Sequence, residues 1–176
     1  MRERFPQFQS ILQVYAVIAV MFAGWTITSF LWKLSAWLLL LNLGEIFTLF
    51  AYALAANFFE SLVILLILLA LSALLPARFL RDDFLVRGTI LSIGLIGSLM
   101  AFVGSHRQFG IGAGLNLLIA PLAVLGLMAF LLHRSSVYQR LRSMAIWLSD
   151  RMVVFLFILI PLFSVASIYV IFRNVA

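Results

Sequence analysis

The chain has 176 residues, of which 65% are hydrophobic and only 10% are charged. Soluble domains are about half apolar and about a quarter charged, so a soluble protein of this size could not cover so much apolar side chain with polar groups. Composition therefore excludes an aqueous enzyme and a disordered chain. It predicts an all-α fold, a polytopic bundle of transmembrane helices forming a single integral membrane domain over residues 1–176.

The formal net charge is +6, and there is no cysteine. Most basic residues lie at the ends of apolar runs, where lysine and arginine orient membrane spans and contact anionic lipid head groups. We therefore expect the lipid bilayer as the partner of this charge, and no nucleic-acid binding. The absence of cysteine excludes disulfides, thiolate metal sites and cysteine nucleophiles.

Several stretches reach the length of about 20 apolar residues that a transmembrane helix needs. Clear spans are predicted over 10–31, 84–105, 112–132 and 152–172. The first is too long for a signal peptide and lacks a small-residue cleavage site, so we expect it to be retained.

The stretch 34–76 is interrupted only by Glu45 and Glu60 and is too long for one straight crossing of a core about 30 Å thick. It forms either two spans with a turn near Asn57, or an interfacial or re-entrant piece over 34–43 followed by one long span over 44–75. The second alternative gives five spans in total, and the first gives six.

The positive-inside rule favours five spans slightly, because it then places nine of the 12 basic residues on one side, against eight with six spans. Asn42 and Gly44 are also stronger helix breakers than the residues around Asn57. We therefore predict five spans, with the N-terminus cytoplasmic and the C-terminus outside. The short loops favour a bacterial cytoplasmic membrane.

An amphipathic helix is predicted over 136–149, before the last span. Val137, Leu141, Met144 and Leu148 fall on one face of it, as in a helix that lies on the membrane surface. Ser149 and Asp150 offer a cap for the following span. The arginines of this region are expected to contact lipid head groups: Arg134, Arg140 and Arg142.

The most informative residues are the acids inside the apolar stretch. On one continuous helix, Thr48 and Tyr52 lie within about 60° of Glu45, and Glu60 lies about 60° to its other side. Such a polar stripe can line a proton or cation path, bind a cationic group, or pair with an arginine of a partner subunit. Alternatively, Glu45 lies at the outer interface beside Lys33, and Glu60 is neutral and hydrogen-bonded across the bundle.

No other residues form a convincing catalytic, cofactor or metal site. His106 and His133 are expected on opposite membrane faces, so one haem could not bind both. Asp82 and Asp83 are too few to hold a metal ion, and Asp83 pairs with Arg87 at i, i+4. We therefore expect no cofactor.

Small residues repeat at helical spacing in the span 84–105, where they allow close helix packing. The predicted packing residues are Gly94, Gly97, Ser98 and Ala101.

These observations favour a non-enzymatic accessory or scaffold subunit, which packs against a membrane protein partner or forms a homo-oligomer. The alternative is a small transporter, or a membrane-embedded substrate-binding component, that uses Glu45, Tyr52 and Glu60. A third reading is a lipid-modifying enzyme assisted by Asp82 or Asp83.

Overall fold

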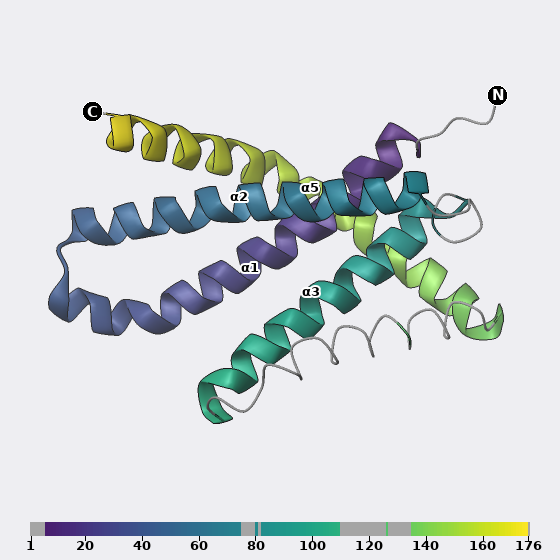
Figure 1. Cartoon of the computed structure of the whole chain (residues 1–176), viewed down its shortest axis with the longest axis horizontal. Helices are drawn as coiled ribbons and strands as arrows, with labels where there is room; N and C mark the ends of the chain where they lie inside the picture. The colour runs from purple at the N-terminus through teal and green to yellow at the C-terminus, as the bar shows by residue number, and fades with distance from the viewer. Residues whose placement is uncertain (1–5, 75–79, 81, 110–125, 127–134, 176) are drawn as a thin grey trace.

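The computed structural model describes residues 6–74, 80, 82–109, 126 and 135–175. Within them are four long helices and no strand (Figure 1). The helices are α1 (Phe8–Leu40), α2 (Leu43–Leu74), α3 (Phe84–Phe109) and α5 (Ser135–Val175). Each is long and apolar enough to cross a membrane, which confirms the predicted all-α class and is compatible with the predicted membrane helix bundle. Apart from Gly126, the predicted span 112–132 lies outside the described residues.

Helix α1 is longer than the span predicted over 10–31. It continues without a break to Leu40, so residues 34–40 extend the first helix and do not form a separate interfacial piece. No glycine or proline interrupts this stretch, and a single lysine does not break a helix. The helix ends at Leu41, whose backbone is extended and whose N–H donates to the Trp37 carbonyl oxygen at 2.8 Å.

Helix α2 begins with reciprocal hydrogen bonds between Asn42 and Glu45. Asn42 Oδ1 accepts from the Glu45 N–H at 3.0 Å, and Glu45 Oε2 accepts from the Asn42 N–H at 2.9 Å. This capping box satisfies two backbone donors that a helix start leaves without partners. From there α2 runs to Leu74 and passes Asn57 without a turn, as in the alternative with one long helix.

Helix α5 joins two elements that the sequence analysis separated. The predicted surface helix 136–149 and the predicted span 152–172 form one helix of 41 residues. Ser149 does not cap a new helix, because its Oγ donates to the Ile146 carbonyl oxygen at 3.0 Å. Asp150 instead accepts a hydrogen bond from Gln13 of α1. Without a glycine or proline at the junction, the helix continues.

The face of this first part of α5 also differs from the prediction. Met144 is 67% exposed, whereas Ala145 is buried against Val86 and Ile90 of α3. The buried face of this part of α5 therefore lies next to the apolar face that the sequence predicts. A separate amphipathic helix on the membrane surface is therefore not confirmed.

Helix α1 is the centre of the bundle. Its residues 14–19 are all buried, which requires neighbours on every side of the helix. Tyr15, Ala16 and Ala19 belong to a core cluster shared with α2 and α5, whereas Val14 and Ile18 belong to a second cluster shared with α2 and α3. Small alanines allow the neighbouring helices to approach α1 closely.

Helices α1, α3 and α5 run in one direction and α2 runs in the other (Figure 1). The first turn of α5 contacts the start of α3, because the Tyr138 hydroxyl donates to the Asp83 carboxylate. The last turn of α5 contacts the start of α2, where Arg173 donates to Thr48. Helices α3 and α5 therefore start at the same end of the bundle.

Candidate functional site: a cavity beside Glu60

Glu60 lies near the middle of α2. At 1.5 Å per residue it is about 26 Å from the first residue of the helix and about 21 Å from the last. A helix that crosses a hydrocarbon core about 30 Å thick thus carries Glu60 near mid-depth. An aspartate at that depth costs about 2.5–3.5 kcal/mol on insertion scales, so an acid placed there requires compensation.

Glu60 borders a cavity of about 370 Å³ between α1, α2 and α3, here called the Glu60 cavity. Its lining residues are Phe22, Trp25, Thr26, Ala53, Ala56, Asn57, Glu60, Ile96, Leu99, Met100 and Val103. Glu60 is the only ionisable residue among them. The site is thus an apolar hollow with one carboxyl group, at the depth where such a group is most costly.

Two neutral polar side chains of the cavity are held by each other and by the backbone. Thr26 Oγ1 of α1 donates to Asn57 Oδ1 of α2 at 2.9 Å, and Asn57 Nδ2 donates to the Phe22 carbonyl oxygen at 3.5 Å. Asn57 is 4% exposed, so these bonds compensate the cost of burying its amide. They also fix α2 against α1 beside Glu60.

Glu60 itself is exposed, and no hydrogen bond joins it to another residue in the described part of the chain. The sequence-based alternative of a neutral Glu60 hydrogen-bonded across the bundle therefore finds no partner among the side chains that the structure describes.

The predicted polar stripe is divided between two places. Thr48 and Tyr52 face the end of α5. Glu60 faces a different direction, because it lies about 120° around the helix axis from Thr48. Thr48 Oγ1 lies 2.9 Å from the Tyr169 hydroxyl and accepts from Arg173 at 2.7 Å. The Tyr52 hydroxyl donates to Asn174 Oδ1 at 2.8 Å.

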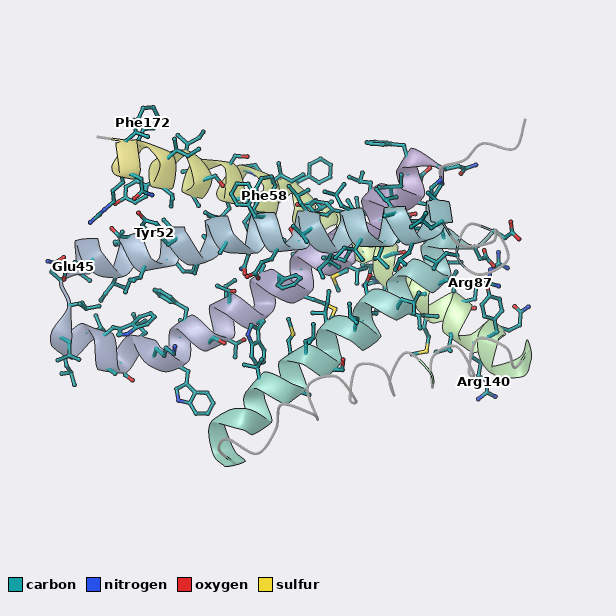
Figure 2. The ribbon with its side chains drawn as sticks, in the orientation of Figure 1. Glu45, Tyr52, Phe58, Arg87, Arg140 and Phe172 are labelled. Atoms are coloured by element: carbon teal, nitrogen blue, oxygen red, sulfur yellow. The ribbon has the colours of Figure 1, made fainter. Side chains whose placement is uncertain are left out.

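These residues form an interhelical polar layer at the start of α2, defined by Thr48, Tyr52, Tyr169, Arg173 and Asn174. Arg173 also donates to the Tyr169 hydroxyl at 3.1 Å, so one guanidinium group connects both helices. Glu45 is the fourth predicted member of the stripe, and it lies at the helix start in the capping box. Figure 2 shows Glu45 at the start of α2, beyond Tyr52.

A second polar region lies at the opposite end of the bundle, where Figure 2 labels Arg87 and Arg140. The Arg87 guanidinium lies 6.0 Å from the centre of the Tyr138 ring, whose hydroxyl donates to Asp83. Tyr138 of α5 thus contacts both members of the predicted Asp83 and Arg87 pair.

A polar cavity of about 370 Å³ lies at this same end. Asp82, Asp83 and Arg142 contribute to its lining, together with Gln7 and Ser10 at the start of α1. Its charges are of both signs, and α1, α3 and α5 all contribute to its lining.

The predicted head-group arginines are described only in part. Arg140 and Arg142 are exposed, and Arg134 lies outside the described residues. Nearby, the Arg151 guanidinium lies 4.4 Å from the centre of the Trp147 ring. Trp147 and Met144 are 57% and 67% exposed, so this part of α5 has an apolar strip bordered by arginines, a pattern suited to a membrane interface.

The predicted packing residues of α3 differ in their surroundings. Gly94 is buried, Gly97 and Ser98 are half-buried, and Ala101 is exposed. A Cβ atom added to Gly97 would meet nothing within 4 Å, and Ser98 Oγ bonds its own helix at the Leu95 carbonyl oxygen. The close approach is at Gly88, where a Cβ would lie 3.3 Å from Val14 Cγ2.

Sequence reasoning missed Thr26, Asn57 and Trp25 as neighbours of Glu60. Asn57 is three residues before Glu60, so helical spacing could have suggested it. No pattern within the sequence relates Thr26 or Trp25 to Glu60, because they belong to another helix. Tyr169 and Arg173 were missed as partners of Thr48 for the same reason.

Within the described residues, no three histidine or acidic side chains gather as metal ligands would. Comparison with protein families, with curated proteins and with solved structures finds no match for this chain.

Proposed function

We propose that this chain is a membrane-embedded binding component, or a small transporter, and that the Glu60 cavity is its binding site. One observation carries the proposal: Glu60, an exposed residue at mid-length of α2, borders a cavity whose other described lining residues are uncharged and mostly apolar. Ionisable residues inside a membrane are costly, and they commonly mark a substrate or ion pathway. In this proposal Glu60 supplies the charge, whereas Asn57 and Thr26 hold the wall of the site.

The proposed topology has five spans, with the N-terminus in the cytoplasm of a bacterial cell. Support comes from the helix directions, because α3 and α5 start at the same end and the chain between them must return to it. The basic side chains at the starts of α3 and α5 then lie on the cytoplasmic side, as the positive-inside rule favours.

The test replaces Glu60 with glutamine in a cation-dependent or proton-dependent uptake assay. We expect Glu60→Gln to abolish uptake while the amount of protein in the membrane stays normal, because the variant removes the charge and keeps the shape. The matched control is Glu45→Gln, since glutamine also serves in a capping box and the net charge changes equally. Uptake that is unchanged in Glu60→Gln contradicts the proposal.

A second candidate is a non-enzymatic accessory or scaffold subunit. The observation that favours it is the large apolar surface of α2 and α5. Only 28% of the most apolar 18-residue segment of α2 is buried, and only 22% of the corresponding segment of α5. Phe59 and Val63, on either side of Glu60 along α2, are 58% and 53% exposed. In this candidate a partner helix covers Glu60. A lone monomer without a copurifying protein in mild detergent contradicts it.

A further inference from the structure

The chemistry of the Glu60 cavity restricts what can bind there. Its walls are supplied mainly by the side chains Phe22, Ile96, Leu99, Met100 and Val103. Apolar walls favour a ligand with an apolar body, and a single carboxylate favours a single positive charge. The volume of about 370 Å³ lies within the range of small-molecule sites, which begins at about 300 Å³.

The neutral polar groups of the cavity are poor candidates for binding a bare metal ion. Thr26 Oγ1 and Asn57 Oδ1 are bonded to each other at 2.9 Å, and the Asn57 amide nitrogen is directed at the Phe22 carbonyl oxygen. Ca²⁺ and Mg²⁺ take at least about six oxygen ligands. The described lining offers far fewer, so an organic cation fits this site better than Ca²⁺ or Mg²⁺.

Trp25 adds a second group that attracts cations. It lines the same cavity from α1, whereas Glu60 lines it from α2. An indole ring attracts an ammonium group through its π electrons, and this attraction is strongest where water is excluded. A carboxylate and an indole on two helices thus border one apolar hollow.

We propose that the Glu60 cavity binds a monovalent organic cation of the ammonium class, with the charge at Glu60 and the apolar body against α1 and α3. This inference rests on the proposed binding function and names its ligand class. Substituted and quaternary ammonium groups suit the site, because their charge is spread over apolar substituents that the walls can contact.

The probe is radiolabelled benzyltrimethylammonium, measured by equilibrium dialysis against the full chain in lipid nanodiscs. Its matched neutral analogue is neopentylbenzene, in which carbon replaces the charged nitrogen and the shape is kept. We expect saturable binding of the cation, at least about tenfold weaker binding to Glu60→Gln, and wild-type binding to Glu45→Gln. The neutral analogue, used as a competitor, is expected to displace the cation poorly.

Three results overturn the inference: no saturable binding to the wild type, equal binding to Glu60→Gln, or equally effective competition by the neutral analogue. Thermal unfolding of Glu60→Gln shows whether the variant is folded, and Glu60→Asp, which keeps the charge, is expected to retain part of the binding. If ammonium binding fails while uptake of another solute still depends on Glu60, the ligand class is wrong and the binding function stands. If neither depends on Glu60, both proposals fail.

Discussion

At Gly88 the absence of a side chain lets α3 approach α1. A Cβ atom there would lie 3.3 Å from Val14 Cγ2, which is closer than ordinary contact, and 3.5 Å from Val14 Cγ1. Val14 is fully buried in the cluster that joins α1 to α2 and α3, so it has little room to move. Between membrane helices, where no water is released on contact, such close packing is a main source of stability.

We therefore expect Gly88→Val to destabilise the protein by about 1–3 kcal/mol, the usual cost of overpacking a core. The matched control is Gly24→Val in α1, where a Cβ would meet nothing within 4 Å. Both variants make the same change of helix propensity, so the difference between them isolates the packing cost. Thermal unfolding in detergent measures both, and an equal effect at the two positions would contradict a close contact at Gly88.

At the scale of the helices, α2 contacts its neighbours through polar groups at two depths. Near its start the interhelical polar layer connects it to α5, and near its middle Asn57 connects it to α1. Hydrogen bonds between membrane helices contribute about 0.6 kcal/mol each on average, so their main effect is on register and orientation. The layer turns Thr48 and Tyr52 toward α5, which leaves Glu60 on the side of α1 and α3.

We expect cysteines at Tyr52 and Asn174 to be joined efficiently by a short bifunctional maleimide, because their side chains are 2.8 Å apart in the native protein. The control pair is Tyr52→Cys with Phe172→Cys. Phe172 is two residues from Asn174 at nearly the same depth, but its ring points away from α2 (Figure 2).

The cysteine-free wild type makes this experiment specific. Cross-linked product is measured as a mobility shift on a denaturing gel. A yield for Tyr52 with Phe172 that equals the yield for Tyr52 with Asn174 would mean that α5 is turned differently around its axis.

At the scale of the whole molecule, the direction of the helices determines the topology. The start of α1 contacts α5 through Gln13 and Asp150, and the end of α5 contacts the start of α2 through Arg173 and Thr48. One end of the bundle thus has the helix starts of α1, α3 and α5, and the other has the turn between α1 and α2.

The proposed topology predicts which positions an impermeant maleimide reaches in intact cells. Leu40→Cys and Val175→Cys are expected to be labelled from outside, because both side chains are exposed at the outer end of the bundle. Gln139→Cys, exposed at the other end, is expected to react only after the cells are permeabilised. Labelling of Gln139 and Val175 from the same side would show that α5 does not cross the membrane. Labelling of Gln139 alone would reverse the orientation.

The sequence by itself determined the class of the protein and the presence of its long helices. Burial of an apolar chain in lipid requires backbone hydrogen bonds within each segment, so hydropathy alone predicts helices. The break at Asn42 was also predictable, because a residue that caps a helix and a glutamate three positions later act locally. Glu45 and Glu60 could also be identified as unusual from the sequence. The free-energy cost of an acidic side chain in a membrane depends only on the apolar segment that carries it.

Only the tertiary structure decided which residues of other helices lie near Glu45 and Glu60. The absence of glycine and proline lets 136–149 continue into the last span, but the face that it buries depends on the packing of Ala145 against α3 and on the hydrogen bond from Gln13 to Asp150, and neither contact can be read from the local pattern. The division of the predicted stripe has a similar origin, because α5 binds Thr48 and Tyr52 whereas α1 and α3 border Glu60. Helical periodicity defines the faces of one helix, but the neighbour of each face is set by the crossing of several helices.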